Sequence, residues 1–94
     1  MNMDELRDRI DAVDDELLRC FAERMDIAGD IARYKAEHGL PVLDERRERE
    51  KLYAVSEKAP EELQSYAVSL YALLFELSRS RQNRLLHKQS PLAE

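Results

Sequence analysis

Two cationic side chains, Arg24 and Lys35, lie on the apolar face of one expected helix. They are eleven residues apart, so they project within about 20° of each other and lie about 16 Å apart along the helix axis. Burying a cation is costly even when it is paired, so a fold alone gains little from this placement. Two cations on one apolar face therefore predict a pocket that binds an anion.

Polar residues also interrupt the apolar faces of two further expected helices. Glu48 begins the apolar line of the second helix, and Ser78 and Gln82 lie one turn apart on an apolar face of the third. Two inward cations against one inward carboxylate leave a surplus of positive charge, and the Ser and Gln add neutral hydrogen-bond donors. The alternative is a set of internal ion pairs, or of edge residues that reach out to solvent. The shared angular position of Arg24 and Lys35 favours the pocket.

The sequence offers no sign of a metal, a cofactor or a nucleophile at this pocket. His38 and His87 have no carboxylate or cysteine at the spacing of metal ligands. Glycine-rich phosphate loops and nucleophile elbows are absent from the sequence, and the single cysteine, Cys20, permits no disulfide within the chain. We therefore expect no metal site and no nucleophilic catalysis at this pocket.

The elements that position these residues are expected to be helices. The 94 residues include 2 Gly and 3 Pro, with 37% charged and 44% hydrophobic residues, which is typical of an all-α domain. Helices are expected over about 4–38, 45–58 and 60–88, with a frayed tail over 89–94, all within a single domain, 1–94. Gly39 and Pro41 end the first helix, Asp44 caps the second, and Pro60 begins the third.

The first helix predicts a homodimer. About 34 residues at about 1.5 Å each make a rod of roughly 50 Å, whereas a compact chain of this length has a radius of gyration of about 12 Å. A second apolar side, which includes Leu18 and Met25, lies about 100° from the first. Arg7 lies on this second side, which we expect to face a partner chain.

The bulk properties exclude other classes of partner. The net charge of -5 argues against nucleic-acid binding, which needs a basic face. The sequence has no apolar run of the roughly 20 residues that span a bilayer, and its first ten residues contain no apolar signal segment. We therefore expect no membrane partner and a cytoplasmic location.

Three segments together resemble the all-helical chorismate mutase family. They are LRDRIDAVDDELLRCFAERMDIAGDIARYK, PVLDERRERE and LSRSRQ, and the resemblance runs from about Leu6 to Gln82. It includes an Arg in the first turns, the spacing of Arg24 and Lys35, D-x-x-R-E on the second helix and S-x-x-x-Q on the third. The resemblance implies an intertwined homodimer that rearranges chorismate to prephenate, the branch step toward phenylalanine and tyrosine, without cofactor or metal.

The resemblance also implies roles for the residues that hold the substrate. Arg24 and the Arg7 of the second chain would bind the two carboxylates of chorismate. Arg47 would line the carboxylate side of the site, and Ser78 would assist the carboxylate on the ring.

The remaining roles implied by the resemblance concern the ether oxygen and the ring hydroxyl. Lys35 and Gln82 would donate hydrogen bonds to the ether oxygen whose bond breaks. Glu48 would accept a hydrogen bond from the ring hydroxyl, to which the backbone N–H of Asp44 would donate. Because Gln82 is neutral at every pH, where some relatives carry a Glu, activity is expected without a need for acidic pH.

Three alternatives share much of this pattern. An isochorismate pyruvate-lyase would use the same fold and most of the cations, although Glu48 and its D-x-x-R-E context favour the mutase. A 4-amino-4-deoxychorismate mutase is closer, because Glu48 could face an ammonium as easily as a hydroxyl. A helical dimerisation or regulatory module without activity would gain stability by replacing its buried cations with apolar groups.

Overall fold

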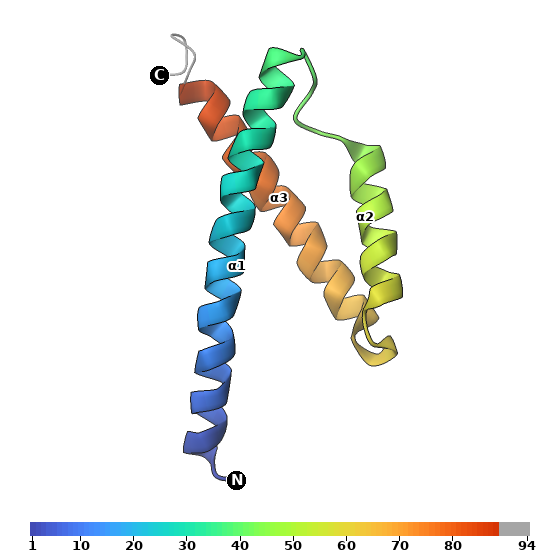
Figure 1. Cartoon of the computed structure of the whole chain (residues 1–94). Helices are drawn as coiled ribbons and strands as arrows, with labels where there is room; N and C mark the ends of the chain where they lie inside the picture. Colours follow the sequence, from blue (N-terminus) through green and yellow to red (C-terminus); the bar gives the residue numbers. More distant parts are fainter. Residues whose placement is uncertain (89–94) are drawn as a thin grey trace.

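The computed structural model describes residues 1–88, which form helices and no β-strand (Figure 1). Helix α1 spans Met3–Glu37, α2 spans Glu45–Lys58 and α3 spans Gln64–Lys88, and a short 3-10 helix, η1 (Glu61–Leu63), precedes α3. The all-α fold class is confirmed. The expected tail over 89–94 lies outside the described residues.

Local hydrogen bonds explain where the helices begin and end. The side-chain oxygen of Asn2 accepts from the N–H of Glu5 at 2.9 Å at the start of α1, and that of Asp44 accepts from the N–H of Arg47 at 3.0 Å at the start of α2. Gly39 has a φ of 65°, the left-handed conformation that favours glycine just after a helix.

The third helix differs from the expectation at its start. Pro60 has φ -53° and ψ 141°, so it precedes the helical turns and is not part of them. Its carbonyl accepts from the N–H of Leu63 at 2.8 Å, which is the i to i+3 bond of a 3-10 turn. The α-helix proper therefore begins at Gln64, four residues later than the sequence indicated.

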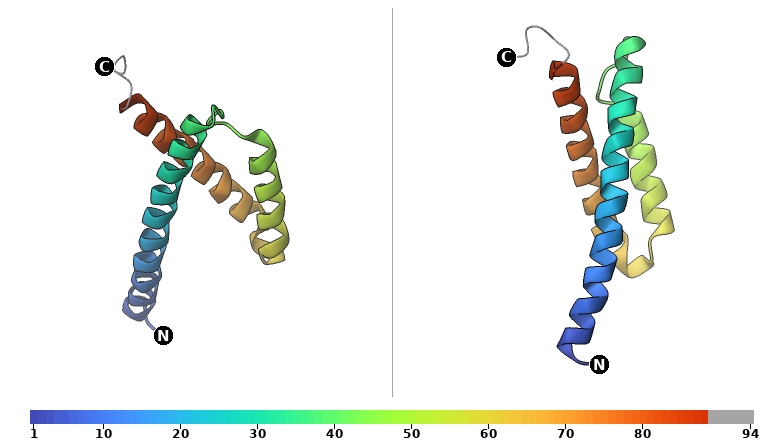
Figure 2. Two further views of the ribbon diagram at one scale, coloured as in Figure 1. Left: turned by 45° about the horizontal axis from the view of Figure 1, so that its top comes forward. Right: turned by 60° about the vertical axis from the view of Figure 1, so that its left-hand side comes forward.

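Helix α3 joins the other two helices. It packs against both α1 and α2, whereas α1 and α2 make no close backbone approach to each other within residues 1–88. Figure 2 shows α1 and α2 as two arms that α3 joins, with α1 crossing α3 and the N-terminal half of α1 extending beyond the rest. The radius of gyration of 16.9 Å exceeds the roughly 12 Å of a compact chain of this length.

Small residues allow α1 and α3 to cross closely. Ala28, Gly29 and Ala32 are the buried residues of α1, and the last of these is 0% exposed. A Cβ placed on Gly29 would lie 3.0 Å from Cδ1 of Leu85 on α3, closer than ordinary contacts allow. The crossing therefore leaves little room for a side chain at Gly29, and Leu85 would have to move to admit one.

Gly29→Val is expected to destabilise the chain by about 1–3 kcal/mol, because the branched side chain must push α3 away from α1. The measurement is the midpoint of thermal unfolding followed by circular dichroism. Ala36→Val, at an exposed position of the same helix, is the matched control for the helix propensity of valine. A Gly29→Val protein that melts at or above the wild-type temperature would contradict the tight crossing, because valine has a higher helix propensity than glycine.

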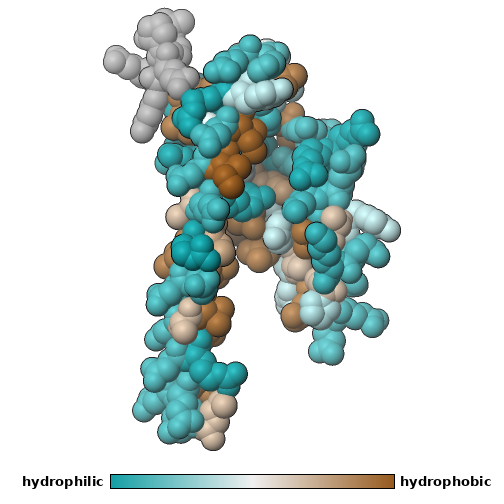
Figure 3. Space-filling view, in the orientation of Figure 1, coloured by the Kyte–Doolittle hydropathy of each residue, from teal (hydrophilic) through white to brown (hydrophobic). Residues whose placement is uncertain are grey.

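One chain leaves much of its apolar surface uncovered. The two-sided burial expected for α1 and α3 is not reached within residues 1–88, where only four hydrophobic side chains are buried. Figure 3 shows apolar side chains between the two arms and along the N-terminal half of α1. Most of the exposed apolar residues of α1 precede the crossing, among them Leu6, Ile10, Val13, Leu17 and Leu18. Among residues 1–88, no helix is long and apolar enough to cross a membrane.

Candidate active site

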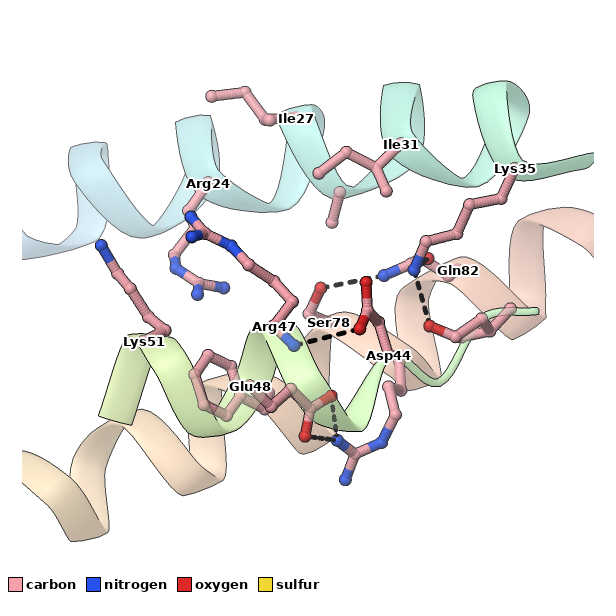
Figure 4. A pocket seen from close by; sticks show the side chains of 14 residues that line it. Arg24, Ile27, Ile31, Lys35, Asp44, Arg47, Glu48, Lys51, Ser78 and Gln82 are labelled. Atoms are coloured by element: carbon pink, nitrogen blue, oxygen red, sulfur yellow. Dashed lines mark hydrogen bonds and ion pairs between the residues drawn. The ribbon is translucent and has the colours of Figure 1, made fainter. Parts of the chain in front are cut away.

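A pocket with a volume of about 580 Å³ lies between α1 and α2, with α3 behind it (Figure 4). This volume is within the range of about 300–1,000 Å³ that small-molecule sites occupy. Helices α1, α2 and α3 and the link before α2 contribute to it. The polar and charged residues that line it are Arg24, Lys35, Asp44, Arg47, Glu48, Lys51, Ser78, Arg79 and Gln82.

Lys35 lies at one end of the pocket and is held by two acceptors. Its Nζ donates to the carbonyl of Val42 at 2.6 Å and to Oε1 of Gln82 at 3.2 Å. The chain turns back after Gly39, and this turn brings the Val42 carbonyl over the last turn of α1. An ammonium has three donors, so one N–H of Lys35 is left for a ligand.

Gln82 is the most buried polar residue among residues 1–88, at 4% exposure. Its Nε2 donates to Oγ of Ser78 at 3.2 Å, while its Oε1 accepts from Lys35. The family resemblance implied that Lys35 and Gln82 both donate to one atom of a substrate. In this structure the ammonium of Lys35 instead donates to the amide oxygen of Gln82.

Arg24 lies at the other end of the pocket, beside two aromatic rings. Its guanidinium carbon is 6.0 Å from the ring centre of Tyr71 and 5.9 Å from that of Phe75, within the range of cation–π contacts. Figure 4 shows Arg47 and Lys51 extending from α2 toward this end. Three cations thus approach one end of the pocket from opposite walls.

Glu48 is bound by an arginine that the sequence had not singled out. Nη1 of Arg79 lies 2.5 Å from both carboxylate oxygens, and the two side chains are 29% and 24% exposed for Arg79 and Glu48, respectively. The contact joins residues 31 positions apart in sequence, so helix periodicity alone carries no signal for it.

The pocket is positively charged although the chain has a net charge of -5. Five cations and two carboxylates line it, and Arg79 with Glu48 is the one ion pair that these residues form within residues 1–88. The expected surplus of positive charge is therefore present. It amounts to three charges, whereas the two cations and one carboxylate expected from the sequence give a surplus of one. An anionic ligand fits this charge distribution.

Seven of the eight expected site residues line this pocket, and Arg7 does not. Arg7 lies seventeen residues before Arg24 on α1, which is about 25 Å along a straight helix. It cannot reach the pocket of its own chain. Lys51 and Arg79 were missed; Lys51 lies one turn after Arg47 and Glu48, so its position on α2 could have indicated it.

No cluster of metal-binding side chains occurs within residues 1–88. The lining residues instead offer hydrogen-bond donors and positive charge: one amide, one hydroxyl and five cations. Such a set can hold an anion in one conformation and stabilise negative charge that develops at a chosen atom. It lacks the paired nucleophile and base of covalent catalysis.

The comparisons with known proteins agree on one family. The family model for chorismate mutase type II matches residues 6–83. The chain is 30% identical to the 4-amino-4-deoxychorismate mutase of Streptomyces venezuelae over 97 aligned positions, which cover 98% of this chain and 91% of that protein.

Two further relatives match about half of the chain. The chorismate mutase of Methanocaldococcus jannaschii is 40% identical over 45 residues, 48% of this chain and 46% of that protein. The T-protein of Haemophilus influenzae is 39% identical over 44 residues, 47% of this chain and 12% of that protein. The matches thus span less than half the length of these two relatives. No solved structure matches the chain significantly.

Proposed function

Because this chain belongs to the chorismate mutase type II family, we propose that its pocket binds chorismate and rearranges it to prephenate. The observation that carries the proposal is Lys35, whose ammonium projects into a positively charged pocket with one donor left for a ligand. The reaction breaks an ether C–O bond and forms a C–C bond within one molecule. It therefore needs no nucleophile and no general base.

The charge of the pocket suits this substrate. Chorismate carries two carboxylates. The pocket is lined by five cations and by two carboxylates of its own, so it has three positive charges in excess. Arg24 binds one substrate carboxylate, supported by Arg47 and the hydroxyl of Ser78. Holding the flexible side chain of chorismate over its ring in the reactive conformation is the first contribution to rate.

The second contribution is electrostatic. As the ether bond breaks, negative charge grows on its oxygen, and the transition state is stabilised by donors already directed at that atom. Lys35 supplies a full positive charge there, and Gln82 turns its amide to donate when the ligand displaces the contact between the two side chains. Glu48 and the backbone N–H of Asp44 bind the ring hydroxyl.

A second candidate substrate is 4-amino-4-deoxychorismate, because the relative that matches nearly the whole chain is named as the mutase of that compound. The two substrates differ only at the ring position that Glu48 is proposed to contact. Both reactions use the same rearrangement and the same cations, so the family alone does not separate them.

The test is to incubate the purified protein with chorismate and follow the loss of its ultraviolet absorbance, with prephenate identified by mass spectrometry. Isochorismate and 4-amino-4-deoxychorismate are tested in parallel, and released pyruvate is measured with lactate dehydrogenase. Prephenate formation supports the proposal. Pyruvate release from isochorismate as the main reaction, or no reaction with any of the three, would refute it.

We further propose that the active unit is a homodimer whose sites are shared between chains. Arg7 lies about 25 Å along α1 from the pocket of its own chain, and the apolar side chains around it are exposed, including Leu6 at 43% and Ile10 at 59%. A second copy that covers this half of α1 would bury those side chains. It would also receive Arg7 at its own pocket as the ligand of the second substrate carboxylate.

Mixing variants tests the shared site. Arg7→Ala and Lys35→Ala are each expected to be nearly inactive when substrate is well below KM, whereas an equal mixture that is unfolded and refolded together should recover about a quarter of wild-type activity. Half of the refolded dimers are mixed, and each mixed dimer contains one intact site. Activity at each stage is measured by the loss of chorismate absorbance.

The control mixture combines Lys35→Ala with Arg24→Ala, which both damage the half of the site that one chain provides. In mixed dimers of this pair, each of the two sites retains a defect, so no recovery is expected. Recovery in the control, or none in the test mixture, would contradict a site shared in this way.

A further inference from the structure

The ion pair between Arg79 and Glu48 lines the pocket, and Glu48 is the residue proposed above to contact the ring position at which chorismate and 4-amino-4-deoxychorismate differ. Nη1 of Arg79 contacts both oxygens of Glu48 at 2.5 Å, and both residues line the pocket. Arg79 comes from α3 and Glu48 from α2, so the pair also links the two helices behind the pocket. Both side chains remain about one-quarter exposed, so the pair is open to the ligand space.

The pair changes what Glu48 can recognise. An unpaired carboxylate attracts a cation strongly, but here its charge is already balanced by the guanidinium of Arg79. A carboxylate has about four acceptor positions, so Glu48 can still accept a hydrogen bond from a neutral group such as a hydroxyl. What it has lost is the net negative charge that would favour an ammonium.

The surroundings make an ammonium still less favourable. An ammonium placed against Glu48 would also lie near the positive charge of Arg79, with four further cations lining the same pocket. Repulsion between like charges at such short range is a strong means of rejecting a ligand. A hydroxyl at the same place meets no such repulsion.

We propose that Arg79 is a specificity-determining residue that neutralises Glu48, so that the site accepts a hydroxyl and rejects an ammonium at the ring position that Glu48 contacts. This inference rests on the proposed function and deepens it, because it assigns the substrate as chorismate and not 4-amino-4-deoxychorismate. Arg79 acts through Glu48 and is a positioning residue.

The experiment compares kcat/KM for the two substrates in the wild type and in Arg79→Gln. The wild type is expected to prefer chorismate, and the variant is expected to reduce that preference by about tenfold or more. The reduction should arise mainly from a higher kcat/KM for the amino substrate. The ratio of kcat/KM for two substrates measured on one preparation does not depend on the fraction of folded protein, so partial unfolding of the variant would not change it.

Two control variants isolate the charge at this position. Arg84→Gln removes the same charge from an exposed position of α3 outside the pocket, and its ratio should equal that of the wild type. Arg79→Lys keeps a cation beside Glu48, so it should restore most of the preference for chorismate.

A measurement on the wild type alone keeps the inference testable if Arg79→Gln does not fold. Raising the pH through the amine pKa of 4-amino-4-deoxychorismate converts the ammonium to a neutral amine. The kcat/KM for this substrate should then rise relative to that for chorismate. The charged groups of the pocket act on both substrates, so the chorismate profile is the control.

The outcomes separate the two claims. If the wild type rearranges neither substrate, the proposed function is wrong. If it rearranges chorismate but prefers the amino substrate, or if Arg79→Gln leaves the ratio within about twofold, the function stands and the role of Arg79 is wrong. If kcat/KM for 4-amino-4-deoxychorismate, divided by that for chorismate, does not change as the pH rises, the inference is also wrong.

Discussion

Lys35→Met is expected to lower kcat for chorismate about a thousandfold. Removing one neutral donor from a site that stabilises a developing oxyanion costs about 10²–10³ in kcat, and a charged donor is roughly twice as strong as a neutral one. Methionine keeps most of the length of the lysine side chain but has no charge and no donor. KM is expected to change much less, because the charge on the ether oxygen grows only in the transition state.

The kinetic test is a steady-state measurement of kcat and KM, with thermal unfolding measured alongside. Lys35 also donates to the Val42 carbonyl, so the variant loses a contact that holds the link before α2. Lys58→Met, at the exposed end of α2, is the matched control for the substitution itself. A Lys35→Met protein that is folded and retains near-native kcat would show that the catalytic role belongs to another residue.

Gln82→Glu is expected to lower kcat/KM by about a hundredfold or more at neutral pH, with activity returning as the pH falls. A carboxylate at this buried position would form an ion pair with Lys35, whose Nζ already lies 3.2 Å from Oε1 of Gln82. It would also place negative charge where the ether oxygen becomes negative. Protonation of the carboxyl restores a neutral donor. At pH values above the carboxyl pKa, kcat/KM should therefore rise about tenfold for each unit by which the pH is lowered.

The measurement is the pH profile of kcat/KM for the variant and the wild type. The wild type has an amide that does not titrate at this position, so it should show no such requirement for acid. Asn83→Asp makes the same change of amide to carboxylate at the exposed neighbouring position and should leave the profile unchanged. If the pH profiles of kcat/KM for Gln82→Glu and the wild type are parallel, Gln82 does not donate to the ether oxygen in the reaction.

Much of the helical structure could be predicted because its causes are local. The end of α1 follows from Gly39 and the start of α2 from Asp44, since a left-handed glycine and a side-chain cap act over a few residues. The start of α3 was predicted four residues early. Pro60 suits either the first helical turn or the residue before it, and its extended conformation is decided by how the chain joins α2 to α3.

The position of most candidate site residues could also be predicted, because a charged or polar residue on an apolar face marks the side that turns inward. Arg24 and Lys35 share one face of α1 in this way, and both line the pocket. The same rule failed for Arg79, which lies to one side of the apolar line of α3. Its contact with Glu48 depends on how α2 and α3 meet, and periodicity within one helix does not contain that information.

The sequence by itself determined that this chain is all helical, that its longest helix exceeds what one small domain can cover, and that two cations point inward together. These properties follow from spacing, caps and the cost of burying charge, all of which are read along one chain. Only the tertiary structure decided that α3 joins α1 and α2 without direct packing between those two, that the space between them is a pocket, and that Glu48 is paired with Arg79. Those features depend on the close crossing at Gly29 and on contacts between residues distant in sequence, which form when helices pack.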